Sequence, residues 1–128
     1  MKKLALIAFA AMMILTACTK EKTPTLDGTS WYCSKTDSGG RKQTCSISFR
    51  NNGGGLGITD SYSSWQTSWD YKYEYTIKSY TFDGESGIIN LQQANSYTRD
   101  GTATFRVNDI QSILYISTPN GSFTLDRR

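Results

Sequence analysis

The stretch Trp69-Asp70-Tyr71-Lys72-Tyr73-Glu74-Tyr75-Thr76-Ile77 alternates aromatic or apolar residues with charged or polar ones throughout. Successive side chains of a β-strand point to opposite faces, so a period of two predicts a strand with one buried and one solvated face. One solvated face is typical of antiparallel sheets. These nine residues therefore predict a half-buried antiparallel strand.

The alternation changes phase just after this strand. Tyr80 and Phe82 occupy even-numbered positions, whereas the aromatic residues of the strand are odd-numbered. One extra residue in a strand shifts the later side chains to the other face, which is the effect of a β-bulge. We therefore expect a bulge or a tight turn near Lys78-Ser79.

A hairpin is predicted upstream, where Trp31–Ser34 and Thr44–Arg50 both alternate with a period of two. The turn-forming residues Asp37–Gly40 lie between these segments. With the turn centred on Gly39, the apolar residues of both strands lie on one face. The glycine-rich segment Asn51–Gly57 lacks the continuation of a phosphate-binding loop, and it is predicted to be a flexible turn before a weak strand.

The rest of the chain consists of short apolar segments separated by turn signals. Asp83-Gly84, Asp100-Gly101 and Asn120-Gly121 each favour a hairpin turn. The strands expected around them are Ile88–Gln92, Thr102–Val107, Ile113–Ser117 and Ser122–Leu125. Short links join antiparallel neighbours, so about eight strands form an up-and-down meander. We predict an all-β fold closed into a small barrel, because closure removes open sheet edges; a two-sheet β-sandwich is the alternative.

The N-terminus has the pattern of an export signal. Lys2 and Lys3 precede an apolar run that ends at Ala17, too short for a membrane-spanning helix. The tetrapeptide Leu15-Thr16-Ala17-Cys18 resembles the bacterial lipobox. That resemblance implies removal of residues 1–17, attachment of diacylglycerol to the Cys18 thiol and acylation, for example with palmitate, of its amine. Such chains would anchor the protein in a lipid bilayer.

Three parts are therefore expected: a signal peptide (1–17), a lipidated tether (18–25) and one domain (26–128). The domain also resembles a known group. Leu26-Asp27-Gly28-Thr29-Ser30-Trp31 is similar to the opening of small lipocalin-like envelope lipoproteins. Further similarities lie in Ser46–Arg50, Thr81-Phe82-Asp83-Gly84, Gly101-Thr102-Ala103-Thr104-Phe105 and Phe123-Thr124-Leu125. The resemblance implies a lipocalin-like β-barrel on a protein of the cell envelope, expected at the outer membrane and facing either the periplasm or the outside.

Two cysteines remain in the domain. The hairpin register places Cys33 directly opposite Cys45, a separation that a disulfide can span. Because the export signal implies an oxidising compartment, we predict a Cys33–Cys45 disulfide; two buried free thiols are the alternative. Cys18, Cys33 and Cys45 would then serve as one anchor and one covalent link.

Composition excludes several classes of function. The chain has no histidine, which removes Ser-His and Cys-His nucleophilic pairs and the commonest metal ligand. Without Lys2 and Lys3 the net charge is about +1, and no basic cluster predicts nucleic-acid binding. We therefore expect neither an enzyme nor a cofactor or metal site.

Two hypotheses for function stay open. In the first, the aromatic row Trp69, Tyr71, Tyr73 and Tyr75 lines the mouth of the barrel, with Trp65 as a lid, and binds a small apolar or amphipathic ligand. The alternative for these residues is that they fill the core. In the second hypothesis, the protein interacts with another envelope protein, as an accessory subunit or as an inhibitor of a hydrolase.

Overall fold

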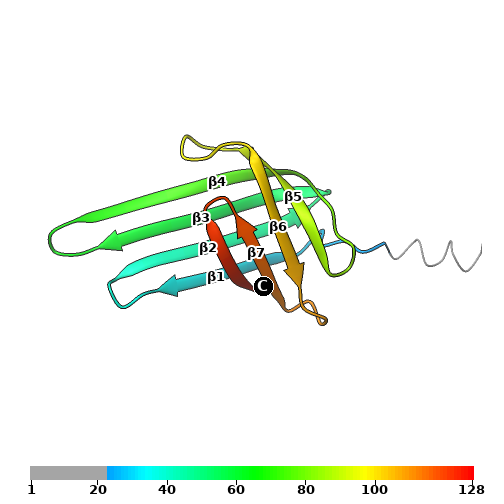
Figure 1. Ribbon diagram of the computed structural model, residues 1–128, viewed down its shortest axis with the longest axis horizontal. Coiled ribbons are helices and arrows are strands. Elements are labelled where there is room, and N and C mark those ends of the chain that lie inside the picture. Colours follow the sequence, from blue (N-terminus) through cyan, green and yellow to red (C-terminus); the bar gives the residue numbers. More distant parts are fainter. Residues whose placement is uncertain (1–22) are drawn as a thin grey trace, which may run out of the picture.

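The computed structural model describes residues 23–128 (Figure 1). The predicted signal peptide, the lipidation site Cys18 and most of the tether lie outside the described residues. Within residues 23–128, all regular structure consists of β-strands. The strands are β1 (Ser30–Thr36), β2 (Arg41–Arg50), β3 (Gly53–Ser63), β4 (Ser68–Tyr80), β5 (Ser86–Gln93), β6 (Gly101–Val107), β7 (Ile113–Thr118) and β8 (Gly121–Arg127).

The strands form an antiparallel meander that closes on itself. Each strand pairs with the next in the chain, and β1 closes the barrel by pairing with β8. The predicted closed barrel is confirmed, and the open sandwich alternative is wrong because β1 and β8 are hydrogen-bonded neighbours. The hairpin register is also confirmed: Trp31 lies opposite Ile47, and Cys33 lies opposite Cys45.

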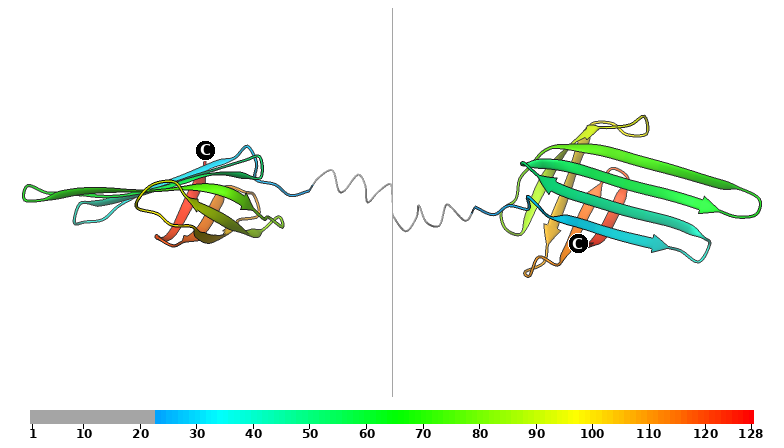
Figure 2. Two further views of the ribbon diagram at one scale, coloured as in Figure 1. Left: turned by 90° about the horizontal axis from the view of Figure 1, so that it is seen from above. Right: turned by 180° about the vertical axis from the view of Figure 1, so that it is seen from behind.

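The strands differ greatly in length. β4 has 13 residues and β7 has 6, which correspond to about 43 Å and 20 Å at about 3.3 Å per residue. β8 pairs with β1 only at Trp31 and Tyr32, and β5 pairs with β4 only from Tyr75 onward. Strands β1–β4 therefore continue past the part of the sheet that β5–β8 cover. We call this extension the arm; it comprises residues 34–44 of β1–β2 and residues 59–73 of β3–β4 (Figures 1 and 2).

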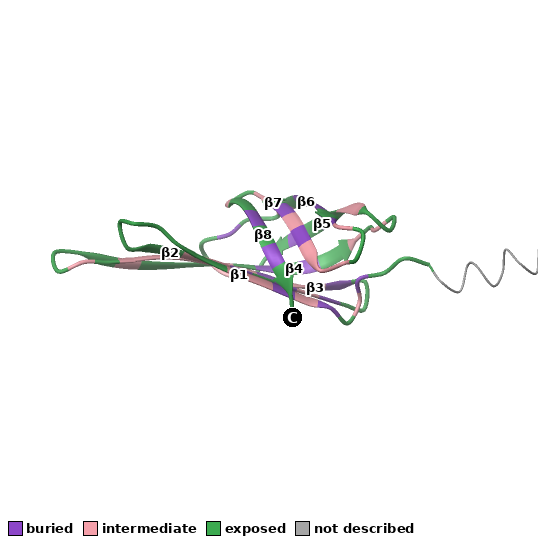
Figure 3. Ribbon diagram, turned by 90° about the horizontal axis from the view of Figure 1, so that it is seen from below, coloured by how far each residue is buried: buried purple, intermediate pink, exposed green. Residues whose placement is uncertain are grey.

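The core occupies the part of the molecule where β5–β8 cross over β1–β4 (Figure 3). Its members are Leu26, Trp31, Cys45, Ile47, Phe49, Leu56, Ile58, Tyr75, Ile77, Ile89, Leu91, Ala103, Phe105, Val107, Leu114, Ile116, Phe123 and Leu125. All of them are at most 5% exposed. These side chains fill the inside of the barrel, whereas the ends of the arm are exposed.

The predicted irregularity in β4 is present. The pairing of β4 with β5 shifts register between Ile77 and Ser79. Because of the extra residue, the side chain of Tyr80 points toward the core although its residue number is even. The Tyr80 ring packs on Phe49 with centroids 4.7 Å apart. The Tyr80 hydroxyl donates to Asp27 Oδ1 at 2.6 Å and accepts from the Leu26 amide at 3.1 Å. The bulge therefore places Tyr80 where it holds the chain entering the barrel.

The prediction of a flexible turn over Asn51–Gly57 is wrong for its glycines. The turn is confined to Asn51-Asn52, both with positive φ, and β3 begins at Gly53. Gly54 has a φ of +142°, and a Cβ at this position would lie 1.8 Å from the Ser48 carbonyl oxygen. Glycine is needed here because the backbones of β2 and β3 approach too closely for a side chain.

We expect Gly54→Ala to destabilise the domain by about 1–3 kcal/mol, because the strands must separate to admit the methyl group. Gly57→Ala is the matched control, since nothing lies within 4 Å of a Cβ at Gly57. Urea unfolding of both variants measures the difference. Equal midpoints would show that the close approach at Gly54 has no energetic consequence.

Candidate functional site

The predicted aromatic row starts in the core and leaves it along β4. Tyr75 is 5% exposed and belongs to the core, whereas Tyr73 is half-buried against it. Trp69 is half-exposed, and Tyr71 is 41% exposed. Trp65 lies in the turn between β3 and β4 at the end of the arm and is 91% exposed. The row therefore runs from the barrel onto the uncovered part of the sheet.

Cross-strand pairing brings a further aromatic residue beside this row. Tyr62 of β3 lies opposite Trp69, on the same face of the sheet. Tyr97 comes from the β5–β6 connection, where it contacts Tyr71 and Tyr73. We call Tyr62, Trp69, Tyr71, Tyr73 and Tyr97 the aromatic face. Sequence reasoning missed Tyr62 and Tyr97, although the even-numbered positions that follow Ile58 with a period of two could have indicated Tyr62.

The rings of the aromatic face pack against one another. Tyr62 and Trp69 have centroids 6.0 Å apart with planes at 24°, and Trp69 and Tyr71 are 5.4 Å apart. Tyr97 meets Tyr71 edge-on at 5.8 Å. Rings in these arrangements attract one another beyond simple burial. The aromatic face is therefore an ordered surface, and a partner would immobilise few additional rotamers on binding it.

An ion pair lies on the same face. The Arg41 guanidinium donates from Nε and Nη2 to the two carboxylate oxygens of Asp60, at 2.8 and 2.6 Å. This hydrogen bonding lowers the pKa of Asp60. The guanidinium also lies 5.8 Å from the centre of the Trp69 ring. Asp60 is the cross-strand partner of Tyr71, so the charges and the aromatic rings form one continuous surface.

The inside of the barrel is closed where the arm begins. The Tyr75 hydroxyl donates to Asn120 Oδ1 in the β7–β8 turn. Nearby, Lys35 Nζ donates to the Ser122 carbonyl at 3.4 Å and lies 5.1 Å from the centre of the Phe123 ring. Tyr75 is thus a core residue that holds the β7–β8 turn against the sheet, and the aromatic row lies beside a filled interior.

Three surface depressions accompany these features, and all are open to solvent. One of 590 Å³ lies near the end of the arm and includes Tyr62, Trp69, Lys42 and Asp70 in its lining. Another, of 340 Å³, lies on the outer side of β2–β4 beside Gly55. The lining of the depression near the end of the arm includes Lys42, Ser61 and Asp70, which are cross-strand partners on the face of the sheet opposite the aromatic face.

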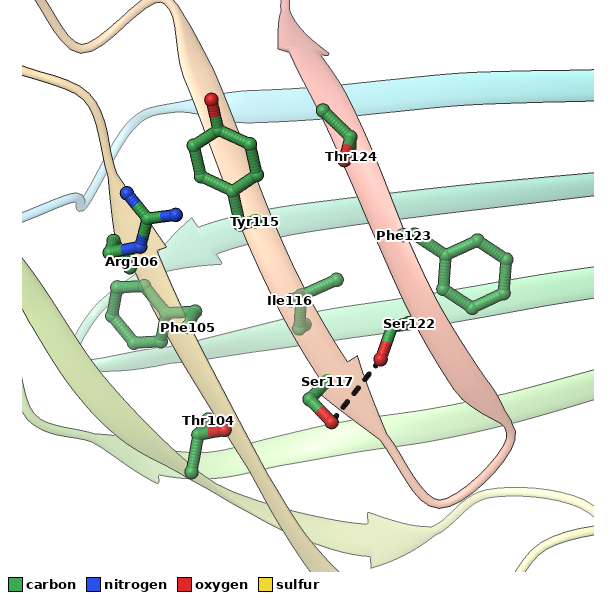
Figure 4. A pocket seen from close by; sticks show the side chains of 9 residues that line it. All are labelled: Thr104, Phe105, Arg106, Tyr115, Ile116, Ser117, Ser122, Phe123 and Thr124. Atoms are coloured by element: carbon green, nitrogen blue, oxygen red, sulfur yellow. Dashed lines mark hydrogen bonds between the residues drawn. The ribbon is translucent and has the colours of Figure 1, made fainter.

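The third depression, of 380 Å³, lies over β6, β7 and β8. Figure 4 shows its hydroxyl groups, including the hydrogen-bonded pair Ser117 and Ser122, and Arg106 beside Tyr115. The Arg106 guanidinium lies 4.3 Å from the centre of the Tyr115 ring. Five hydroxyl side chains and one stacked guanidinium line this depression together with Phe105, Ile116 and Phe123.

The two domain cysteines lie directly opposite each other on β1 and β2. Hydrogen bonds from Asp37 N to Arg41 O and from Phe49 N to Thr29 O place odd-numbered partners of this ladder in hydrogen-bonded pairs. Such pairs have Cα atoms about 5.5 Å apart, within the range that disulfides span. Both thiols are free in this structure. The disulfide therefore stays a prediction for the oxidised protein.

Burial strongly affects these two thiols. It raises the pKa of Cys33, and it raises the pKa of Cys45 to about 12. Neither thiol is therefore poised as a nucleophile at neutral pH, because the reactive species is the thiolate. Within residues 23–128, no group of three or more cysteine or acidic residues is arranged to hold a metal ion. The same residues contain no helix long and apolar enough to cross a membrane.

A scan against models of protein families finds no match, and searches of curated proteins and of solved structures find none either. The lipobox and the lipocalin-like envelope group therefore stay predictions from the sequence motifs. The barrel itself rests on the strand pairing described above.

Proposed function

We propose that this protein is a lipid-anchored, non-catalytic lipoprotein of the bacterial envelope that binds another protein through the aromatic face of its arm. One observation carries the proposal: an ordered cluster of tyrosine and tryptophan lies outside the core, on a part of the sheet that β5–β8 do not cover. A small domain of this kind has no structural need to extend four paired strands beyond its core.

The residue types favour a protein partner. Tyrosine, tryptophan and arginine are enriched at the centres of protein interfaces, where they contribute large contact areas together with hydrogen-bonding groups. Tyr71, Trp69 and Arg41 combine these properties on one surface. A small apolar ligand inside the barrel, our first hypothesis from the sequence, is less favoured because core side chains fill the interior. Inhibition of a hydrolase is one form that the proposed interaction could take.

The position of the anchor supports the proposal. Cys18 lies five residues before Thr23, where the described chain begins, and five extended residues reach at most about 18 Å. The chain enters the barrel at the end opposite the arm (Figures 1 and 2). A lipid on Cys18 would therefore hold that end near the bilayer and leave the arm pointing away from it, where a partner can reach the aromatic face.

The test compares two double variants in detergent-solubilised envelopes. Trp69→Ala with Tyr71→Ala removes the centre of the aromatic face, and we expect it to reduce the recovery of a co-purifying partner at least tenfold. The matched control is Tyr115→Ala with Arg106→Ala, which removes a stacked pair from the outer side of the barrel. Mass spectrometry with labelled standards quantifies recovery for each protein.

We expect the control variant to recover as much partner as the unchanged protein. Circular dichroism and thermal unfolding of both variants check that the barrel is intact. The proposal would be wrong if the unchanged protein recovers no specific partner, or if the control variant loses it as completely as the aromatic variant does.

A further inference from the structure

Both outer strands of the arm, β1 and β4, lack a neighbouring strand on one side, and the open edge of β4 is the longer. β5 pairs with β4 only from Tyr75 onward, so the segment from Ser68 to Tyr73 has β3 on one side and no strand on the other. Most sheet edges in this protein are removed by closure of the barrel. An uncovered edge presents unpaired backbone groups and is a template for pairing with another chain. This edge also borders the aromatic face.

The hydrogen-bond pattern shows which backbone groups point outward. At the β3–β4 turn, Ser64 N donates to Thr67 O at 2.8 Å, which places odd-numbered β4 residues in hydrogen-bonded pairs with β3. In an antiparallel ladder, the alternate residues direct their N–H and C=O groups to the other side. The backbone N–H and C=O groups of Ser68, Asp70 and Lys72 therefore point toward the open edge.

Contacts next to the edge agree with this assignment. The Lys72 carbonyl accepts a hydrogen bond from Asn95 Nδ2 at 2.7 Å, and the Glu74 carbonyl accepts one from the Ala94 amide at 3.2 Å. Both donors lie in the connection that follows β5. This connection also brings Tyr97 against Tyr71, so the open edge consists of the outward backbone groups of Ser68 and Asp70 and the amide of Lys72.

A second copy of this chain is a poor occupant of the edge. The register that pairs the whole of Ser68–Lys72 in two antiparallel β4 strands is centred on Asp70. That register places the Asp70 carboxylates of the two copies directly opposite each other, and like charges in this position are destabilising. Among the described residues, Asp70 makes no salt bridge. Its carboxylate is therefore available to a basic side chain on a different strand.

We propose that the edge of β4 binds an extended segment of the partner protein, which adds an antiparallel strand beside Ser68–Lys72 and places a lysine or arginine opposite Asp70. The residues on either side of this basic residue project onto the aromatic face beside Trp69 and Tyr71. Main-chain hydrogen bonds supply affinity in this mode of recognition, and alternate side chains supply specificity. This inference rests on the proposed function and specifies how the partner is recognised.

The first test selects seven-residue peptides from a fully randomised display library against the mature, acylated protein in detergent micelles. We expect enriched peptides to carry lysine or arginine between two aromatic or β-branched residues. Selection against the Asp70→Lys variant should instead enrich aspartate or glutamate at that position. The best basic peptide should bind Asp70→Lys at least tenfold more weakly, and exchanging its basic residue for glutamate should restore binding to the variant.

The second test separates strand addition from simple aromatic contact. N-methylation of the basic residue removes the N–H that faces β4 and should abolish binding of the selected peptide. N-methylation of the next residue, whose N–H faces away, should leave the affinity within about twofold. The inference is overturned if no peptide is enriched, if both proteins select the same peptides, or if the two methylated peptides bind equally. In each of these cases, loss of the partner in the Trp69→Ala and Tyr71→Ala protein would still support the proposed function.

Discussion

Replacing Trp31 by alanine is expected to destabilise the domain by about 3–5 kcal/mol, the usual effect of removing a buried tryptophan. Trp31 is 1% exposed, and its Nε1 donates to Thr29 Oγ1 at 2.9 Å. The same hydroxyl donates to the Leu26 carbonyl at 2.6 Å. The substitution therefore leaves a large cavity and removes one end of a buried hydrogen-bonded chain. Small domains have a free energy of unfolding of about 5–15 kcal/mol, so the substitution would remove a large part of it.

Trp65→Ala provides the matched control for this prediction. Trp65 is 91% exposed at the end of the arm, and surface substitutions of this kind usually change stability by less than about 0.5 kcal/mol. Urea unfolding followed by circular dichroism measures both variants, because each substitution alters the tryptophan fluorescence. A similar loss of stability in the two variants would contradict the assignment of Trp31 to the core.

Reduced protein is expected to lose stability with rising pH, and oxidised protein is expected to lose less. A free thiol has an ordinary pKa of 9.0, whereas burial raises that of Cys45 to about 12 in the folded chain. The folded state therefore holds its proton more tightly, so stability is fully present below pH 9 and declines between about pH 9 and 12. At pH 10.5 the loss would be about 2 kcal/mol, since one pKa unit corresponds to about 1.36 kcal/mol.

A Cys33–Cys45 disulfide removes both titrating thiols. Tyr75 and Tyr80 also have pKa values raised by burial, but they contribute equally in the two redox states. The difference between reduced and oxidised protein therefore isolates the cysteines. Urea unfolding from pH 8 to 10.5, with and without a phosphine reductant, measures it, and a protein carrying Cys33→Ser and Cys45→Ser should show no effect of the reductant. Parallel curves for the two redox states would contradict the predicted disulfide.

Local patterns were sufficient to predict the architecture. The alternation from Trp69 to Ile77 predicted the central strand, and the turn centred on Gly39 predicted the β1–β2 register correctly. The change of phase at Lys78-Ser79 predicted the shift in pairing between β4 and β5. Each of these features depends on residues close together in the chain, for which a period of two and turn chemistry are reliable guides.

The arm was not predictable in the same way. Its existence depends on β5 and β8 ending their pairing at Tyr75 and Tyr32, which is decided by contacts between distant segments. The alternation from Trp69 to Tyr75 is the same whether the row faces a core or solvent. Tyr97 was missed because a connection of no regular structure brings it to β4. Gly54 was misread because only the neighbouring β2 backbone reveals why a side chain cannot fit.

The aromatic row of β4 has different surroundings at its two ends. Its inner member, Tyr75, fills the core, as the alternative interpretation of the sequence had it. Its outer members, Trp69 and Tyr71, lie on the uncovered sheet together with Tyr62. The row therefore contributes to the fold at one end and offers a contact surface at the other.

Photo-crosslinking in intact envelopes tests the central claim most directly. A photoreactive phenylalanine analogue would replace Tyr71 on the aromatic face or Tyr115 on the outer side of the barrel, which lies beside Arg106 in Figure 4. We predict one discrete protein adduct from position 71 and none from position 115. An adduct from position 115 alone, or no adduct from position 71, would contradict the claim that the aromatic face is the recognition surface.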